Sequence, residues 1–470
     1  MKSAEGTAKG LRKGFSTGST SAAVVRASIK YYFDNKKFNF LEIKMPAGES
    51  AVLKVSSLVK FRLDPDLTIS KAVLTKDSGD DSADVTGGIE ICADFTAIDK
   101  KNKNAVKILK KYYENFSVYN IIKCPLPDDP ADLIMFFVSS KGIGIVKRKG
   151  LPLRTGFPAI NPVPLKMIES AAYEELKLRL SISASNGHMH YAEKIFFSIL
   201  YVPEGEKIAE QTLNPRLGIE GGISILGTSG YVVPISTKAW LETIKACLNF
   251  LKANKIDTCV LTPGRFSEKA ALKIFKNLQR ESFIEIGDYV SYSLRKVSGS
   301  GIKNIIFAGQ FGKIVKIAQG ARNTNAKYTS LDLVFLARIA QEAVKKSISN
   351  GAEAMHIKAE SANKKDCSYG CNDADFYKKG ELLYGLIVNS NTSREAFGYI
   401  TSDDFKIYSD GILSELLKKA AENLYNIVKN AVSNETCSLE DKNAKEDNIN
   451  IRIKIVLIDY GGNAIKKERL

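Results

Sequence analysis

The chain has 470 residues, enough for two or three domains with separate cores, and its 44% hydrophobic and 26% charged residues match an ordinary soluble globular protein. No apolar run approaches the roughly 18 to 20 residues of a membrane helix, and the first residues lack the apolar segment of a signal peptide, so we expect a cytoplasmic protein with no membrane partner. The net charge of +16 indicates an anionic partner, unless it reflects a compositional bias of the genome. Because no basic block is interleaved with aromatic residues, we expect a polyanionic small molecule and no nucleic acid.

The seven cysteines are scattered over the chain and do not form a disulfide framework. Only Cys367 and Cys371 are close together, and no second Cys or His pair stands near them to complete a zinc site. We therefore expect no resident metal.

A loop rich in glycine and hydroxyl residues, Gly14–Thr20, leads into an apolar stretch that predicts a helix of about three turns. Ser16, Thr17 or Ser19 can cap its first turn. Free amides at a helix N-terminus favour a carboxylate or phosphate, so this loop is either an anion site or an ordinary helix cap.

Four aspartates crowd into eight residues after two strands that we expect around residues 38–45 and 51–55. These aspartates are Asp77, Asp80, Asp81 and Asp84. Their spacing does not match a calcium-binding EF-hand loop. They form either a solvated turn or one polar wall of a ligand site.

Further strands are expected at residues 89–98 and 133–138, the second preceded by a polar turn at 128–132. A glycine- and proline-rich path over 141–164 then leads into a helix near 165–172. This path carries four basic residues that are either an anion contact or solvated surface: Lys147, Arg148, Lys149 and Arg154.

The segments 178–185 and 194–202 have the pattern of an antiparallel pair around a tip that contains His188 and His190. Two histidines without a third ligand do not predict a metal site.

Five glycines surround one short apolar run in Asn214–Pro234. We expect Ile223–Leu226 to be a buried strand there. Glycines have no side chain and so allow another group to come close to the backbone. The loop is therefore either a strained turn or one wall of a ligand site, where Thr228 and Ser229 would supply hydroxyl groups. Ser236 is expected to cap a helix that runs to about residue 251.

Strands and helices then alternate, which is typical of βαβ units in a parallel sheet. In chain order we expect strand 257–261, helix 267–278, strand 283–286, helix 288–297, strand 303–308 and helix 313–319. The turn Gly309–Lys313 leaves a strand and opens a helix, where α/β folds bind ligands. It is not a Walker A loop, and no GxGxxG sequence follows any of the strands.

The remainder predicts helices at 330–348 and 413–432, a capping box at Thr392–Glu395, and a closing strand at 449–459. Residues 349–382 are expected to be irregular, and 433–448 disordered.

The fold class is therefore α/β, with mixed α+β structure in the N-terminal part and parallel βα units in the C-terminal part. We expect an N-terminal domain over 1–240, a βαβ domain over 241–348, and a helical extension over 349–470 whose final strand completes the second domain.

Six sequence motifs occur in an order typical of one family. They are GFSTGSTSAA, KDSGDDSADVTGG, KGIGIVKRKGLPL, PAINPVPLKMI, VPEGEKIAEQTLNPRLGIEGGISILGTSG and GQFGKIVKIAQGARNT. The chain resembles the cobalt-precorrin-5B C(1)-methyltransferase family, CbiD, over nearly its whole length. The family's fold is not that of a Rossmann methyltransferase.

The resemblance implies an enzyme of anaerobic cobalamin biosynthesis that moves a methyl group from S-adenosylmethionine to C1 of a cobalt corrinoid, yielding cobalt-precorrin-6A. Cobalt would arrive with the substrate, and the carboxylates of the ring suit the excess of basic residues. A homo-oligomer is compatible with the sequence, which does not predict the oligomeric state.

The resemblance also implies a set of binding residues, without dividing them between the methyl donor and the corrinoid. They are Thr17, Gly18, Ser19, Asp77, Asp80, Asp81, Asp84, Thr86, Asn161, Asn214, Arg216, Gly221, Gly222, Gly227, Thr228, Lys313, Asn323 and Thr324. Arg216 is the first choice for pairing with a substrate carboxylate, because its planar guanidinium can bind in a bidentate manner. No catalytic acid or base is predicted.

The chain departs from the family pattern at several positions. A glutamate is usual at Phe157, histidines at Gln310 and Asn325, a cysteine at Thr20, and an aspartate near Ser330. Because two histidines are absent, a tetrapyrrole carrier without turnover stays open as a second function. The Ser/Thr/Gly loop at 14–20 leaves a third function open, that of an enzyme that binds a phosphate ligand there.

Overall fold

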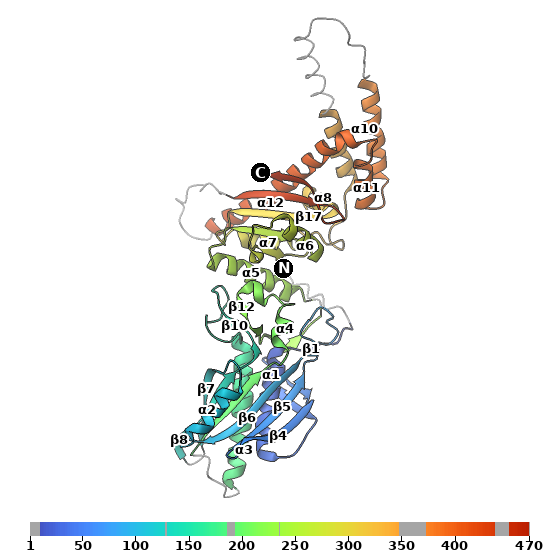
Figure 1. The fold of residues 1–470 in the computed structure, drawn as a ribbon. Helices are drawn as coiled ribbons and strands as arrows, with labels where there is room; N and C mark the ends of the chain where they lie inside the picture. The colour runs from blue at the N-terminus through green and yellow to red at the C-terminus, as the bar shows by residue number, and fades with distance from the viewer. Residues whose placement is uncertain are drawn as a thin grey trace. The chain divides into compact units, whose positions relative to one another are not determined.

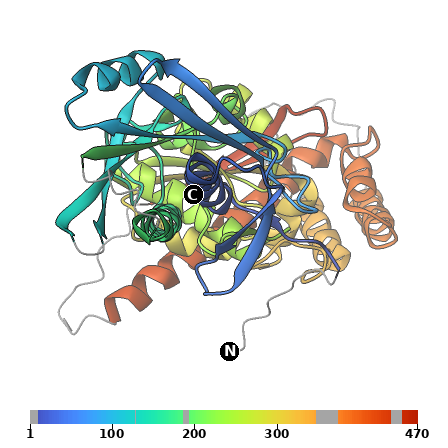
Figure 2. The same ribbon diagram turned by 90° about the horizontal axis from the view of Figure 1, so that it is seen from below.

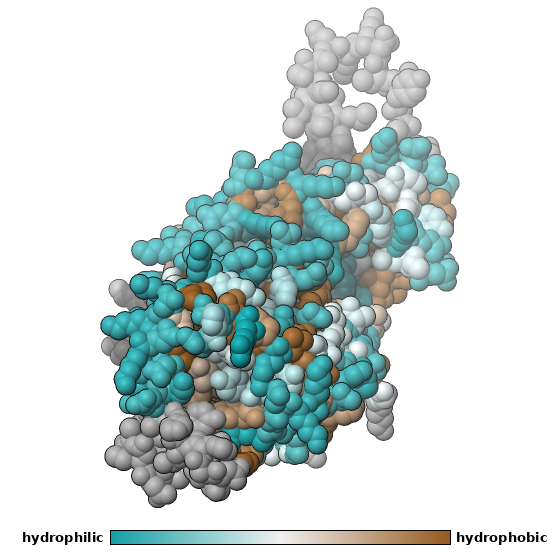
Figure 3. All heavy atoms as spheres, turned by 60° about the horizontal axis from the view of Figure 1, so that its bottom comes forward, coloured by the Kyte–Doolittle hydropathy of each residue, from teal (hydrophilic) through white to brown (hydrophobic). Residues whose placement is uncertain are grey.

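The computed structural model describes residues 10–126, 129–185, 193–234, 236–346, 373–437 and 451–469. The chain divides into two compact units, Met1–Thr237 and Lys238–Leu470. Hydrophilic residues cover most of the face drawn in Figure 3, and hydrophobic residues lie among them in small groups. This mixture is normal for a globular protein.

A six-stranded mixed sheet forms the base of the first unit (Figure 1). Its strands in spatial order are β4 (Ser57–Asp64), β5 (Leu67–Thr75), β6 (Glu90–Asp99), β11 (Lys194–Tyr201), β8 (Asp129–Ser139) and β7 (Ser117–Leu126). Strand β11 runs antiparallel to β6 and parallel to β8. Two further strands, β2 (Phe40–Lys44) and β3 (Ser50–Lys54), form a separate antiparallel pair.

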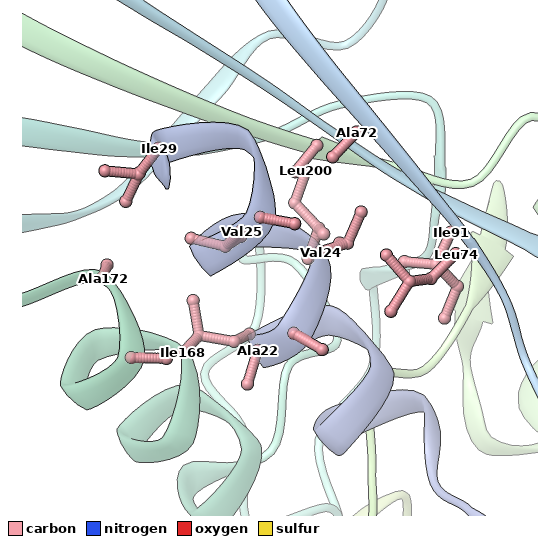
Figure 4. Close-up of a cluster of buried hydrophobic side chains, with 14 of the residues drawn as sticks. Ala22, Val24, Val25, Ile29, Ala72, Leu74, Ile91, Ile168, Ala172 and Leu200 are labelled. Atoms are coloured by element: carbon pink, nitrogen blue, oxygen red, sulfur yellow. The ribbon is translucent and has the colours of Figure 1, made fainter. Parts of the chain in front are cut away.

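Helices α1 (Thr17–Asp34) and α3 (Pro162–Ser185) cover one face of this sheet, and α2 (Lys103–Tyr112) covers the other (Figure 2). Figure 4 shows the small apolar side chains of α1 between α3 and the strands. Val24 and Val25 of α1 are fully buried there, as is Ile168 of α3. Because α1 is buried on nearly all sides, its alanine- and valine-rich sequence fits a central helix.

The antiparallel pair expected from residues 178–185 and 194–202 is wrong, because 178–185 is the last part of α3. Leu176 and Leu180 are buried one and two turns after Ala172, so the apolar spacing is helical. The predicted tip with His188 and His190 lies outside the described residues. The polar turn expected at 128–132 is also wrong in part, since β8 already begins at Asp129.

Three two-stranded ladders join the glycine-rich segments of the first unit. They are β1 (Gly14–Phe15) with β14 (Tyr231–Val232), β9 (Gly142–Ile143) with β13 (Gly222–Ile223), and β10 (Ile145–Val146) with β12 (Ile219–Glu220). Helix α4 (Gly205–Ala209) and the 3-10 helix η1 (Asn214–Leu217) lie between β11 and β12 in the chain. The strand predicted at Ile223–Leu226 is therefore mostly wrong: only Ile223 belongs to β13, Ile225 makes an isolated bridge to Ile160, and Leu226 is 49% exposed.

A five-stranded sheet forms the centre of the second unit. In spatial order its strands are β16 (Phe283–Glu285), β15 (Thr258–Thr262), β17 (Asn304–Gln310), β18 (Arg452–Ile458) and β19 (Ala464–Arg469). The first four are parallel and β19 is antiparallel, which confirms the predicted parallel βα architecture.

Helices α5 to α8 alternate with the strands in the order that the sequence pattern predicted, and further helices follow them in the chain (Figure 1). The helices of this unit are α5 (Thr237–Ala253), α6 (Arg265–Ile274), α7 (Val290–Val297), α8 (Phe311–Ala318), a helix over 333–346, α10 (Asp373–Val388), α11 (Ser393–Ile400) and α12 (Lys406–Cys437), with a 3-10 turn, η2 (Arg280–Ser282). The capping box is confirmed in part: Thr392 Oγ1 accepts a hydrogen bond from the Glu395 amide, but the Glu395 carboxylate accepts from the Asn391 amide.

Two expectations for the C-terminal part need correction. Helix α10 begins within the segment 349–382 that we expected to be irregular, and α12 continues to Cys437, inside the segment expected to be disordered. The remaining parts of those segments, including Cys367 and Cys371, lie outside the described residues. Strand β18 does not close the chain, because β19 pairs with it after a short turn.

Candidate functional site

Five of the six motifs converge in the first unit. The loop before α1 bonds to the segment after β13, where the Gly18 amide donates to the Leu226 carbonyl at 3.0 Å. The Asn161 amide donates to the Ile225 carbonyl at 2.9 Å, and the Gly144 amide to the Ile223 carbonyl at 2.9 Å. The Phe15 amide donates to the carbonyl of Asp77 in the aspartate-rich motif at 2.7 Å. These bonds connect segments more than two hundred residues apart in sequence into one structure.

Thr17 and Ser19 are buried in this junction. The Thr17 hydroxyl accepts a hydrogen bond from the Leu226 amide at 2.8 Å and faces the carbonyls of Ser224 and Leu226 at 3.2 Å. The Ser19 hydroxyl donates to the Gly230 carbonyl at 2.6 Å. Ser16 is the helix cap, since its hydroxyl accepts from the Ser19 amide. Thr17 and Ser19 therefore hold the loops together, and any contact of theirs with a ligand stays a prediction.

Asn214 and Gly222 also hold the loops of this junction together. The Asn214 side chain donates to the Gly222 carbonyl at 2.9 Å and accepts from the Ser224 hydroxyl at 3.0 Å. A Cβ atom on Gly222 would lie 2.3 Å from the carbonyl of Gly142, so backbone packs on backbone there. The glycine at this position thus serves the fold. A Cβ on Gly227 would likewise overlap the Ser16 side chain, and one on Gly18 would overlap Pro164.

The aspartate-rich loop is held by cations and by its own amides. Asp77 forms a bidentate ion pair with Arg12, whose hydrogen bonds keep the Asp77 pKa below its usual value. Asp80 accepts from the Arg12 amide at 2.7 Å, and Asp81 accepts from the Ala83 amide at 3.0 Å.

Asp84 pairs with Lys76, whose side chain is only 1% exposed. Burial by itself would raise the Asp84 pKa, but hydrogen bonds from Lys76 and Thr86 outweigh it and hold the pKa below the usual range. Thr86 donates through both its amide and its hydroxyl. The carboxylates of this loop are therefore occupied mainly by hydrogen bonds and ion pairs within the protein, which favours the solvated turn over a ligand-binding wall.

Other predicted residues remain accessible on the same loops. Gly221 and Thr228 are exposed, and Gly221 has a φ of 75° with open space where a side chain would stand. The Asn161 side chain is half-buried at the start of α3 and has no hydrogen-bond partner among the described residues. We call Asn161, Gly221 and Thr228, together with the basic residues below, the loop surface.

Basic residues from two motifs meet at one end of the β10–β12 ladder. Because the ladder is antiparallel, the residues that follow β10 and those that precede β12 lie at the same end. The Lys147 amide donates to the Gly218 carbonyl at 2.7 Å, and the Arg148 side chain lies directly over Gly218. Arg216, half-buried in η1, comes two residues before Gly218. Lys147, Arg148 and Arg216 thus lie on the segments that meet at this end of the ladder, and cations there suit carboxylates.

Phe157, where we expect a departure from the family pattern, lies next to β10, because its carbonyl accepts a hydrogen bond from the Val146 amide at 2.9 Å. Its ring packs edge-on against Tyr119 with centroids 6.3 Å apart, and the Arg154 guanidinium stands 4.3 Å from its centroid. The Tyr119 hydroxyl donates to the Ile160 carbonyl at 3.2 Å. An aromatic surface next to cations suits a flat conjugated ligand.

The sixth motif lies in the second unit and surrounds Asp288. Lys313 pairs with the Asp288 carboxylate, which also accepts from the Thr324 hydroxyl at 2.7 Å and from the Asn325 amide group at 3.1 Å. Burial raises the Asp288 pKa less than these bonds lower it, so the pKa lies below its usual value. Asn323 accepts from the Asn325 amide at 2.9 Å and so shapes the turn.

Asp288 was not among the predicted site residues. Its position just after β16, at the carboxyl edge of the parallel sheet, was the available signal. The predicted residues Lys313, Asn323 and Thr324 do come together around it. Asn325, another position where we expect a departure from the family pattern, donates a hydrogen bond to Asp288. Gln310 stands at the N-cap of α8, and Ser330 accepts a bond from Gln319 through its carbonyl.

Within the described ranges, no group of three or more His, Cys, Asp or Glu side chains is arranged to hold a metal ion. Among the helices that the structure describes, none combines the length and apolar character needed to cross a membrane.

Comparison with known proteins places the chain in a family. The family model CbiD matches residues 4–234. The cobalt-precorrin-5B C(1)-methyltransferase of Geobacter metallireducens is 33% identical over 341 residues, which cover 70% of this chain and 80% of the relative. The enzymes of the same name from Geobacillus kaustophilus and Geobacter sp. are 35% and 37% identical, covering 72% and 70% of this chain and 77% and 79% of theirs.

A crystal structure of a cobalamin biosynthesis protein (cbiD) from Archaeoglobus fulgidus covers 68% of this chain and 83% of that chain, at 23% identity and a TM-score of 0.31. The sequence matches are much stronger: each of the three relatives is more than 30% identical over more than two thirds of its length. This chain therefore belongs to the cobalt-precorrin-5B C(1)-methyltransferase family.

Proposed function

We propose that this chain transfers a methyl group from S-adenosylmethionine to C1 of cobalt-precorrin-5B in cobalamin biosynthesis. The observation that carries the proposal is the extent of the match to enzymes of that name. The aligned 341 residues exceed the length of the first unit, so the similarity includes both units. Cobalt would enter as part of the substrate.

The loop surface of the first unit supports an anionic, conjugated ligand. The acetate and propionate groups of a corrinoid would pair with Lys147, Arg148 and Arg216, and the ring would lie against aromatic and glycine-lined surface. We therefore propose that the loop surface binds the macrocycle.

The chemistry requires little from the protein beyond alignment. In the reaction a carbon–carbon bond forms at C1 while the carbon–sulfur bond of the sulfonium breaks, and S-adenosylhomocysteine leaves. No protein nucleophile is needed, so orientation and exclusion of water are the main contributions of the chain.

Transfer of label tests the activity. Purified protein is incubated with cobalt-precorrin-5B and S-adenosylmethionine labelled in its methyl group, and we expect label in the macrocycle together with S-adenosylhomocysteine. Corrinoid binding without label transfer would instead favour a carrier of the same fold, an alternative motivated by Gln310 and Asn325. Binding of nucleoside triphosphate in place of either reactant would refute the proposal.

Arg216→Ala tests the assignment of the loop surface. Loss of a charge-assisted bond to a carboxylate should weaken corrinoid binding roughly tenfold or more, with a small change in melting temperature. Lys54→Ala is the matched control, because Lys54 is an exposed cation on β3 outside the loop surface. A variant that melts much earlier but binds the corrinoid normally would make Arg216 a structural residue.

A further inference from the structure

The second unit has the strand order of a doubly wound fold. From β15 the chain moves to β16 on one side, and then to β17 and β18 on the other side. The order reverses between β15 and β17, and open α/β sheets bind ligands beyond the carboxyl ends of their strands at such a point. A ligand of this unit is therefore expected at the loops after β15 and β16.

A glycine and a glutamate face each other at this edge. Thr262 pairs with Glu285 in the parallel register, so both strands end side by side. A Cβ atom on Gly264, just after β15, would have the Glu285 carboxylate oxygen as its nearest neighbour at 4.0 Å. Glu285 lies 21 positions after Gly264. Nucleoside-binding βαβ units use an acid about 20 residues after the glycine turn, at the end of the second strand, to bind ribose hydroxyls.

A serine in the first turn of α6 lies at the same place. Ser267 is only 4% exposed, and among the described residues nothing forms a hydrogen bond with its hydroxyl. Ala270 and Ala271 of α6 pack on the sheet, and Ser267 lies on the same face of the helix, one turn nearer to its N-terminus. That position puts Ser267 over the carboxyl edge, beside the uncapped first turn of α6.

An aromatic ring lies close to the backbone that follows Glu285. A Cβ atom on Gly287, two residues after Glu285, would lie 3.2 Å from the indole nitrogen of Trp240 in α5. Trp240 is 39% exposed and is the single tryptophan of the chain. An exposed indole beside an acidic strand end offers a stacking surface for a purine base.

We infer that this edge, formed by Gly264, Ser267, Glu285 and Trp240, binds the adenosine part of the methyl donor. The inference rests on the proposed function, because it names the place of one of its two reactants. Glu285 accepts hydrogen bonds from the ribose hydroxyls, the missing side chain of Gly264 leaves room for the sugar, and adenine lies beside Trp240. Ser267 and the first amides of α6 face the carboxylate of the methionine part.

Binding of S-adenosylhomocysteine, the stable product, tests the inference. We expect titration of the full-length protein to change the fluorescence of Trp240 and to give a dissociation constant by calorimetry. Glu285→Gln should weaken binding roughly 10- to 100-fold, because hydrogen bonds to a charged acceptor are lost. Gly264→Val should weaken it at least tenfold, although the backbone there is extended and has space for the side chain. Glu242→Gln, the same change at an exposed position of α5, should leave the dissociation constant unchanged.

A pair of nucleosides separates recognition of ribose from loss of structure. Glu285→Gln should weaken the binding of adenosine and leave that of 2′,3′-dideoxyadenosine unaltered, whereas a damaged fold would weaken both. If the unaltered protein binds S-adenosylhomocysteine and both edge variants bind it equally well, the inference is overturned and the proposed function stands. If the unaltered protein neither binds S-adenosylhomocysteine nor transfers label, both are overturned.

Discussion

The buried pair of Lys76 and Asp84 gives a sharp test of whether the aspartate-rich loop is a scaffold. Lys76 follows β5, and its amide and carbonyl bond to Ile89 and Gly88 across the neck of the loop at 2.8 Å. Its side chain is 1% exposed and that of Asp84 is 15% exposed. Asp84→Asn would leave the Lys76 ammonium group buried without a counter-charge.

The expected magnitude follows from that burial. Removing one partner of a buried ion pair costs about 3–5 kcal/mol, because the remaining charge has neither water nor an opposite charge. For a cooperative unit of this size, such a loss should lower the melting temperature by roughly 10 °C. Lys76→Met combined with Asp84→Asn removes both charges, so we expect this double variant to recover much of the loss.

Urea denaturation of the full-length protein, followed by circular dichroism, measures these free energies. Because the folded pKa of Asp84 is lowered, its contribution is present above the ordinary carboxyl pKa and is lost as the pH falls through the lowered value. The difference in stability between the unaltered protein and Asp84→Asn should therefore shrink on acidification. A change below about 1 kcal/mol at neutral pH, with corrinoid binding abolished, would refute the scaffold role and make Asp84 a ligand contact.

Two further predictions concern buried groups of the first unit. Asp94 accepts a hydrogen bond from Tyr113 at 2.5 Å, and burial raises its pKa from 3.8 to about 6. The folded state holds this proton more tightly, so the associated stability, roughly 3 kcal/mol, is present below the unfolded pKa and is lost as the pH rises through about 6. Asp94→Asn should abolish this pH dependence of stability, measured by urea denaturation at pH 4.5 and 7.5. An unchanged pH dependence in this variant would contradict the prediction. Gly222→Ala should lower the free energy of unfolding by about 2 kcal/mol or more, because the new methyl group would overlap the Gly142 backbone. Gly221→Ala should lower it by only about 1 kcal/mol, because Gly221 has a positive φ but open space for a side chain. Equal melting temperatures of the two variants would contradict this difference.

The roles of the motif residues could be predicted only in part. The sequence predicted that Thr17, Asn214 and Gly222 bind the substrate or the methyl donor. In the structure their side chains or backbones make contacts within the protein. A sequence motif does not reveal whether a polar side chain faces a ligand or a carbonyl of a distant segment. That distinction depends on which segments meet, as Thr17 and Leu226 do across more than two hundred residues.

Local patterns were reliable where the chain's own periodicity decides the structure. The alternation of strands and helices from Thr258 to Ala318 predicted the parallel sheet, and the cap at Ser16 was among those expected. The pattern failed at Leu178–Ser185, where a short apolar alternation fits a strand as well as the end of a long helix. Contact of α3 with the sheet and α1 resolves that ambiguity.

By itself the sequence determined the class of fold, the family and the segments that carry its motifs, because these depend on periodicity and on residue identity along the chain. Only the tertiary structure decided which motif residues are internal connections, such as Lys76 with Asp84, and which remain accessible, such as Gly221 and Thr228. It also brought Glu285 and Gly264 together at the end of β15 and β16. The physical reason is that the burial and the pairing of side chains depend on contacts between segments distant in sequence, and a local sequence pattern does not predict which segments come into contact.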